Sequence, residues 1–338
     1  MVQRNLRLDK PKYSLIVPVY NRPDEIKELL ESLVPQSYDN YELVIVEDGS
    51  DIPCEDIVSQ YQDSIEIRYF FKENAGPSYA RNFGMDKALG EYFIFCDSDC
   101  ILPKNYFQNI DEELKKEKVD AFGGPDRAHP SFNDLQKATS YAMTSFLTTG
   151  GIRGGKKKVD KFYPRSFNMG ISREVFENVG GFPKTKMHPG EDMVFTIEIM
   201  RKGFKTKLLE DAYVFHKRRT SLAKFKKQVF NFGYTRVIIS RLYPETFKIF
   251  YVFPSLFILG NLALLALGFY QPVFFIPISL YIVLLFLDAL LKEKKLSVAF
   301  LSIATSLTQL WAYGTGFIKA WWDINVKGRD KFGVISRK

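Results

Sequence analysis

The sequence has little cysteine and little histidine, with three residues of each type among 338. Cys54, Cys96 and Cys100 form an odd-numbered, irregularly spaced set, which is typical of a reducing compartment and offers no zinc-binding pattern. We assign these cysteines no chemistry. No Gly-x-Gly-x-x-Gly follows the first predicted strand, so a dinucleotide cofactor is disfavoured.

An apolar signal region is also missing, because charge appears already in Met1-Val2-Gln3-Arg4. Without a secretory signal, we expect the part of the chain that precedes the apolar helices to stay in the cytosol.

Charged residues are absent from Ile249 to Leu287, a stretch about twice as long as the roughly 20 residues that span a bilayer. Gln271-Pro272 near its middle indicates a turn, so two spans forming a hairpin are predicted. A second uncharged stretch, Leu296 to Ile318, is long enough for a third span. The alternative is a buried pair of core helices, but apolar runs of this length are rare in soluble proteins.

Positive charge gathers just before these apolar stretches, within a net charge of +8. Such a cluster is typical of the cytoplasmic side of a membrane protein and attracts anionic lipid headgroups, whereas nucleic acid is a weaker interpretation and none is expected. The cluster, opposed only by Glu245, comprises Lys217, Arg218, Arg219, Lys224, Lys226, Lys227, Arg236, Arg241 and Lys248. The basic tail from Lys327 to Lys338 fits three spans poorly, because three spans would place it on the outer face.

Strand and helix patterns alternate through the first part of the chain, which predicts βαβ units and a mostly parallel, Rossmann-like α/β sheet. The predicted strands are 13–21, 41–46, 65–71 and 92–96, and the predicted helices are 23–34, 78–89 and 193–202. A further helix, Leu222 to Leu242, mixes aromatic and basic residues as an amphipathic interfacial helix does.

The strand from Tyr92 to Cys96 ends in two carboxylates, Asp97 and Asp99, separated by Ser98. Ionised carboxylates at the carboxyl end of a buried strand need a cation, and this edge is where open α/β sheets bind ligands. The alternative is an Asp-rich turn that merely caps the next element.

Five short motifs in this order together resemble glycosyltransferase family 2 over roughly residues 12 to 220. The resemblance implies a GT-A fold, a nucleoside diphosphate sugar donor, a divalent metal and inversion at the anomeric carbon. The motifs are Val17-Pro18-Val19-Tyr20-Asn21, Glu47-Asp48-Gly49-Ser50, Asn74-Ala75-Gly76-Pro77 with Ala80-Arg81-Asn82, Asp97-Ser98-Asp99, and Gly190-Glu191-Asp192.

The resemblance assigns Asp97 and Asp99 to the metal, with Asp99 as the direct ligand, and oxygen ligands suit Mg²⁺ or Mn²⁺. His216 is an additional metal or diphosphate contact, or else a structural histidine. Asp48 would accept from a uracil-type base, or is a simple turn acid, and Arg81 would face the diphosphate. The implied donor-binding set is Pro18, Tyr20, Asn21, Glu47, Asp48, Asn74, Gly76, Arg81, Asp97, Ser98 and Asn168.

An inverting transfer also needs a general base for the acceptor hydroxyl. By resemblance Asp192 is this base and Glu191 supports the site, although acids at this position also cap helices. The segment from Thr148 to Arg165, rich in glycine and lysine, is expected to be a mobile loop over an anionic substrate or an ordinary solvated loop.

The expected organisation is a catalytic domain over 1–220, an interfacial helix region over 221–246, about three transmembrane helices over 247–322 and a basic tail over 323–338. We expect an inner-membrane, multi-pass glycosyltransferase that uses UDP- or GDP-sugar and a lipid-linked polyprenyl acceptor in surface polysaccharide synthesis. Processive family members carry the pattern Gln-x-x-Arg-Trp in this region. The sequence that begins at Gln228 departs from it, so the transfer of one sugar per encounter is favoured. Two alternatives stay open: a polyprenyl-phosphate sugar synthase, and a non-catalytic nucleotide-sugar-binding membrane protein.

Overall fold

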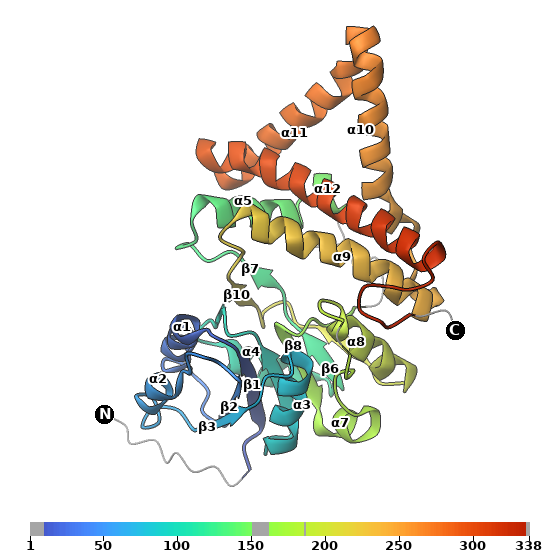
Figure 1. Ribbon diagram of the computed structural model, residues 1–338. Coiled ribbons are helices and arrows are strands. Elements are labelled where there is room, and N and C mark those ends of the chain that lie inside the picture. Colours follow the sequence, from blue (N-terminus) through green and yellow to red (C-terminus); the bar gives the residue numbers. More distant parts are fainter. Residues whose placement is uncertain (1–9, 151–161, 186, 336–338) are drawn as a thin grey trace. The chain divides into compact units, whose positions relative to one another are not determined.

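The computed structural model describes residues 10–150, 162–185 and 187–335. The chain divides into two compact units (Figure 1). The first unit contains the described residues up to His129, those from 162 to Lys184, and Glu191–Lys217. The second contains 130–150, the short segment up to Gly190, and the chain from Arg218 onward. Residues 130–150, which the sequence analysis includes in the catalytic domain, fall in the second unit of this division, and the functional domain boundaries stay a prediction.

A seven-stranded sheet in the order β3-β2-β1-β4-β8-β6-β9 forms the centre of the first unit. Its neighbouring strands are parallel except that β8 runs antiparallel to β4 and β6. The mostly parallel α/β sheet predicted from the sequence is therefore confirmed. The strands are β1 (Tyr13–Val19), β2 (Tyr41–Asp48), β3 (Ile67–Lys72), β4 (Tyr92–Cys96), β6 (Ala121–Gly123), β8 (Asn168–Ser172) and β9 (Thr206–Leu208).

Side chains alternate between the two faces of this sheet, as the period of two in a strand requires. Leu15 and Ile94 pack with one helix layer, whereas Ile16 and Phe95 pack with the other. Helices α1 (Pro23–Leu33), α2 (Glu55–Ser59) and α4 (Tyr106–Lys116) cover the first face. Helices α3 (Pro77–Lys87), α7 (Arg173–Val179) and α8 (Glu191–Arg201) cover the second. The two layers bury the central strands β1, β2, β4 and β8 of the described sheet on both faces, and the strand ends remain open to ligands.

A smaller sheet joins three short segments that are far apart in the sequence. It consists of β5 (Cys100–Ile101), β7 (Asp126–Arg127) and β10 (Val214–His216), with β10 in the middle. Because β5 begins directly after Asp99, this sheet brings the end of the first unit's chain to the aspartates that follow β4.

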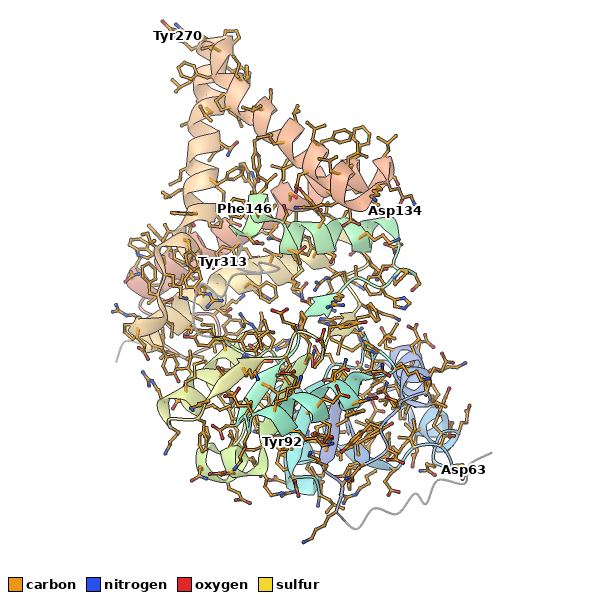
Figure 2. The ribbon with its side chains drawn as sticks, turned by 180° about the vertical axis from the view of Figure 1, so that it is seen from behind. Asp63, Tyr92, Asp134, Phe146, Tyr270 and Tyr313 are labelled. Atoms are coloured by element: carbon orange, nitrogen blue, oxygen red, sulfur yellow. The ribbon has the colours of Figure 1, made fainter. Side chains whose placement is uncertain are left out.

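Six helices dominate the described part of the second unit, where the 3-10 helices η1 (Pro244–Thr246), η2 (Ile249–Val252) and η3 (Pro272–Phe275) form short connections. Helices α10 (Phe253–Tyr270) and α11 (Ile276–Glu293) form a hairpin, and Tyr270 lies at its tip (Figure 2). Helix α12 (Leu296–Asn325) follows, packed with α5 (Asp134–Thr144), α6 (Phe146–Thr149) and α9 (Leu222–Leu242). By length and composition, three helical segments, 249–270, 272–293 and 296–325, could each cross a membrane.

Helix α9 has the bounds predicted from the sequence, and its apolar side chains pack on α12. Phe225 and Val229 form one cluster with Ala312 of α12. Glycines let the two backbones approach closely, since a Cβ at Gly233 would lie 2.0 Å from the carbonyl oxygen of Tyr313. The described apolar face of α9 is thus largely used within the protein, and its interfacial character stays a prediction.

Several element boundaries differ from those predicted. Strand β2 continues through Glu47 and Asp48, because both residues keep their parallel pairing with Phe71 and Lys72 of β3. Helix α8 begins at Glu191, two residues earlier than expected. Most of the predicted glycine-rich and lysine-rich loop from Thr148 to Arg165 lies outside the described residues.

Candidate active site

The candidate site lies at the carboxyl ends of β1 and β4. Strand β1 pairs with β2 on one side and with β4 on the other, so the connections diverge between β1 and β4. Such a topological switch point is where doubly wound sheets bind their ligands. Tyr20 and Asn21 follow β1, and Asp97, Ser98 and Asp99 follow β4. Two of the five motifs therefore meet at one edge of the sheet.

Asp99 and His216 are placed side by side by the small sheet. His216 pairs with Cys100 in the antiparallel register of β5 and β10, and the backbone N–H of Lys217 donates to the carbonyl of Asp99 at 3.0 Å. The imidazole Nε2 of His216 lies 3.1 Å from Asp99 Oδ1 and 3.9 Å from Asp97 Oδ2. Two carboxylates and one imidazole thus converge on one point.

This donor set fits a divalent cation of the Mg²⁺ or Mn²⁺ class. The ligand atoms of Asp99, Cys100 and His216 all lie within 4.8 Å of one another. Burial raises the pKa of the Cys100 thiol well above its usual value. The carboxylate oxygens are the ligands that Mg²⁺ and Mn²⁺ prefer.

The electrostatics of His216 agree with this fit. Burial alone lowers the pKa of His216, but its interactions with Cys100, Asp99 and Asp97 outweigh burial and leave the pKa above its usual range. The ring of Phe167 stacks on the imidazole with centroids 4.9 Å apart, which fixes its orientation. The negative surroundings that favour a protonated imidazole also favour a bound cation, which competes with that proton.

Arg81 joins the aspartate motif to the start of α8. Its guanidinium is nearly fully buried, donates to Asp97 Oδ1 at 2.8 Å and lies 3.3 Å from Glu191 Oε1. Burial alone lowers the pKa of Arg81, but Asp97 and Glu191 raise it, so the group stays charged. Gly84 lets α3 reach the sheet, since a Cβ there would lie 2.4 Å from Ile16. The predicted diphosphate contact of Arg81 stays a prediction, because two carboxylates already engage its side chain.

Asp192 lies in the first turn of α8 with one carboxylate oxygen engaged. Oδ1 accepts from the backbone N–H of Met193 at 2.7 Å and lies 3.5 Å from Arg165 Nη1. Within the described ranges, Oδ2 accepts no hydrogen bond. The side chain is 14% exposed.

Asp48 holds the loop that precedes α3. Its carboxylate accepts from the backbone N–H groups of Ala75 at 3.1 Å and Gly76 at 2.7 Å, and it pairs with Lys72. Gly76 has φ +99°, a conformation that glycine adopts without strain. A nucleobase would have to share the Asp48 carboxylate oxygens with this loop and with Lys72. The predicted contact between Asp48 and the nucleobase remains a prediction.

Glu47 and Asn21 tie the loops after β1 and β2 together. Glu47 is fully buried; Ser50 donates to its Oε1, and Cys54 and Tyr69 donate to its Oε2. Asn21 Oδ1 accepts from the backbone N–H of Asp51 at 2.8 Å. Both side chains are engaged by contacts within the protein, and donor contacts by them are still only predicted.

The remaining members of the predicted set differ in access. Asn168 is buried, accepting from Tyr106 at 2.6 Å and donating to the carbonyl of Ala212 at 2.8 Å. Tyr20 is half exposed and Asn74 is exposed, whereas Ser98 is buried. Pro18 is partly exposed near the end of β1. Tyr20 and Asn74 are thus the most accessible of this group to an incoming nucleotide.

Three contributors were missed by sequence reasoning: Lys72 beside Asp48, Phe167 on His216, and Arg165 beside Asp192. Phe167 directly precedes Asn168, and Arg165 ends the glycine-rich and lysine-rich segment, but nothing in the sequence shows which side chain they meet. The parallel register of β2 with β3 could have suggested Lys72, because it pairs directly with Asp48.

Comparison with known proteins supports the resemblance seen in the motifs. Residues 14–180 match the model of the family Glycosyl transferase family 2. The match ends before Gly190-Glu191-Asp192, so it does not test the proposed base. The matched range includes Asp48 at the end of β2 and Asp97 and Asp99 directly after β4.

Curated relatives have the same kind of name. An uncharacterized glycosyltransferase of Rickettsia felis is 33% identical over 141 residues, which are 42% of this chain and 23% of that protein. Glycosyltransferase GlyA of Streptococcus pneumoniae is 34% identical over 126 residues, 37% of this chain and 18% of that protein. The chain thus spans about a fifth of the length of these two relatives.

A solved structure extends the likeness of fold over most of the chain. The mannosyltransferase PcManGT from Pyrobaculum calidifontis, in complex with GDP-Man and Mn²⁺, has a TM-score of 0.57 at 20% identity. The alignment covers 93% of this chain and 88% of that one. The fold of the first unit is therefore a GT-A fold. Residues 14–180 of the chain form a glycosyl transferase family 2 domain.

Proposed function

We propose that the chain transfers a sugar from a UDP- or GDP-sugar to a lipid-linked glycan acceptor at a membrane, with inversion at the anomeric carbon. The observation that carries this proposal is the convergence of Asp97, Asp99 and His216 at the switch point, joined through Arg81 to the start of α8. A cation-binding group beside a free carboxylate supplies both requirements of the reaction, charge compensation and a base.

Asp99, Asp97 and His216 would hold Mg²⁺ or Mn²⁺, which neutralises charge on the diphosphate leaving group. The named complex of the mannosyltransferase with GDP-Man and Mn²⁺ supports this class of donor and cation. The Asp48 carboxylate and the loop it holds would receive the nucleoside, together with Tyr20 and Asn74 at the open edge.

Asp192 would take the proton of the acceptor hydroxyl through Oδ2 as that hydroxyl attacks the anomeric carbon. Arg165 near Oδ1 and the backbone N–H of Met193 orient the carboxylate. Glu191 would act through Arg81, because their contact ties the first turn of α8 to Asp97.

The acceptor class follows from the second unit. Three helices long and apolar enough to cross a membrane support attachment to the bilayer in which a polyprenyl-linked acceptor dissolves. We place the catalytic unit on the cytoplasmic face of the inner membrane, in surface polysaccharide synthesis, where nucleotide sugars are made available.

The test is a donor panel. The purified full-length chain in lipid vesicles is incubated with Mn²⁺ and a series of UDP- and GDP-sugars, and release of the nucleoside diphosphate is followed. We expect one donor to be consumed, with release abolished by a chelator. Tight binding of a donor that is never consumed, with or without membrane lipid extract as acceptor, would instead support the non-catalytic binding protein.

A further inference from the structure

Helix α12 runs between the two feet of the α10–α11 hairpin. Near its start, Ala299 packs with Leu285 and Ala289 in the last turns of α11. Near its middle, Gly314 meets the first turn of α10, where a Cβ would lie 2.5 Å from the carbonyl oxygen of Pro254. Fifteen residues separate these two contacts on α12, about 22 Å along a helix axis. Figure 2 shows Tyr313 at one foot and Tyr270 at the opposite end of the hairpin.

This arrangement ties the direction of α12 to that of the hairpin. If α10 and α11 enter the bilayer together, their two feet lie at the same membrane surface. A helix that connects the two feet then runs along that surface. For α12 to cross the bilayer instead, one foot would have to lie at each surface, and the hairpin could not enter and return.

Helix α12 forms hydrogen bonds with α5 and a close backbone contact with α9. Thr305 of α12 donates to the carbonyl of Ala138 in α5 at 2.9 Å, and Ser297 donates to Asp134 at 2.6 Å. On α9, the carbonyl oxygen of Phe230 would lie 2.1 Å from a Cβ at Gly316. Because of these contacts, α5 and α9 must occupy the same position relative to the membrane as α12.

Helix α9 carries exposed charged side chains, which makes it unsuited to lie inside the bilayer beside a membrane-spanning helix. Its exposed Lys224, Lys226, Lys227 and Arg241 have no place among lipid tails, where a charged side chain is costly. Neither α5 nor α9 is among the helices apolar enough to span. At a membrane surface the same cations would face anionic headgroups, which favours that position.

The hairpin has the opposite character. In the most apolar stretch of each segment, the share of residues buried within the protein is 17% for the segment of α10 and 11% for that of α11. The corresponding share for α12 is 39%. Large apolar side chains are exposed along both hairpin helices, among them Leu256, Leu259, Leu262, Leu280, Leu284 and Leu287. Lipid is the environment that would cover these side chains.

The chain after α12 returns to α9. Asp323 accepts from Tyr234 at 3.0 Å, and the backbone N–H of Lys331 donates to the same Tyr234 hydroxyl at 2.9 Å. The described part of the basic tail is therefore held by the helix that follows the catalytic unit in the chain.

We propose that the α10–α11 hairpin alone enters the bilayer, and that α12 lies in the plane of the membrane surface beside α5 and α9. The partner of this helix layer is the headgroup region of an anionic bilayer, and the basic tail stays on the side of the catalytic unit. The proposal removes the conflict that three spans created for the tail. It also suits the tryptophans, since all three, Trp311, Trp321 and Trp322, lie on α12 and tryptophan favours the interface.

The tryptophans provide the test, because they report the depth of α12 alone. The double variant W321F/W322F leaves Trp311, which is close to the midpoint of α12. The full chain is placed in phosphatidylcholine–phosphatidylglycerol vesicles, and its fluorescence is quenched with lipids brominated at shallow or deep acyl positions. We expect stronger quenching of Trp311 by the shallow label than by the deep label.

A deep control is available in the same chain. Leu262 lies near the middle of α10 and is half exposed, so L262W in a background with all three tryptophans replaced by phenylalanine should be quenched mainly by the deep label. Trp311 quenched as deeply as this control would overturn the proposal.

A second measurement follows the tail. Cys54, Cys96 and Cys100 are buried, so a membrane-impermeant maleimide should label mainly introduced cysteines. We expect D63C in the catalytic unit and R329C in the tail to be labelled from the same side of sealed vesicles. Labelling from opposite sides would mean an odd number of crossings and would contradict the proposal.

Discussion

At the residue scale, buried charges hold the candidate site together. Arg81 and Glu191 are both nearly fully buried, and each compensates a charge that would otherwise be costly inside the protein. Asp97 adds a second carboxylate to the same guanidinium, and the free oxygen of Asp192 lies in the same helix turn as Glu191. Substitutions of the buried charges should therefore change the stability of the protein, whereas substitution of Asp192 should change its activity.

Arg81→Met should lower the free energy of unfolding by about 3–5 kcal/mol, because it removes the buried guanidinium that pairs with the Glu191 and Asp97 carboxylates. Denaturant unfolding of the full chain in detergent measures the change. Arg22→Met is the matched control, since Arg22 pairs with Glu25 at an exposed position and should cost at most about 1 kcal/mol. Adding Glu191→Gln to Arg81→Met should recover part of the loss, and no recovery would show that the pair is not what stabilises this region.

Asp99→Ala should abolish the metal-dependent part of donor binding, because the remaining ligands leave the diphosphate charge poorly compensated. Calorimetric titration of the donor with and without Mn²⁺ measures this part. Asp86→Ala removes an exposed acid of α3 and should leave the titration unchanged. An Asp99 variant that binds the donor as the parent does would place the cation elsewhere.

At the element scale, close helix contacts depend on glycine in the second unit. A Cβ at Gly233 would collide with the backbone of α12, whereas a Cβ at Gly260 of α10 would meet nothing within 4 Å. The two glycines are therefore a matched pair for testing the packing of α9 on α12.

Gly233→Ala should destabilise the protein by roughly 1–3 kcal/mol, because the two helices must separate to admit the methyl group. Gly260→Ala should be neutral or slightly stabilising, since alanine favours a helix over glycine. Thermal unfolding of both variants in the same detergent measures the difference. Equal melting temperatures would contradict the described contact between α9 and α12.

The same scale shows what could be predicted from the sequence. The alternation of strands and helices predicted the sheet, because each element contains its own periodic pattern. The meeting of His216 with Asp99 could not be predicted, since it depends on β5 pairing with β10 more than 100 residues away. For the same reason the burial of Asn168 was not foreseen: its partners Tyr106 and Ala212 come from distant parts of the chain.

At the scale of the whole molecule, composition predicted a catalytic part followed by apolar helices, and the structure adds that the helical unit takes α5 from within the earlier part of the chain. Hydropathy alone predicted three spans, because it scores α12 without its neighbours. The contacts of α12 with the hairpin feet and with α9 are what carry our proposal of an in-plane helix.

The central claim, that this membrane-attached chain moves a sugar with Asp192 as its base, is tested by one paired measurement on the full chain in vesicles. Donor affinity and single-turnover transfer into lipid-extractable product are compared for the parent and Asp192→Asn. Asparagine keeps a side-chain oxygen that can accept from the backbone N–H of Met193, so folding and donor affinity should be preserved. Transfer should fall by about 10²–10⁴-fold, because an amide cannot accept the acceptor's proton. Transfer at the parental rate in Asp192→Asn would contradict the account.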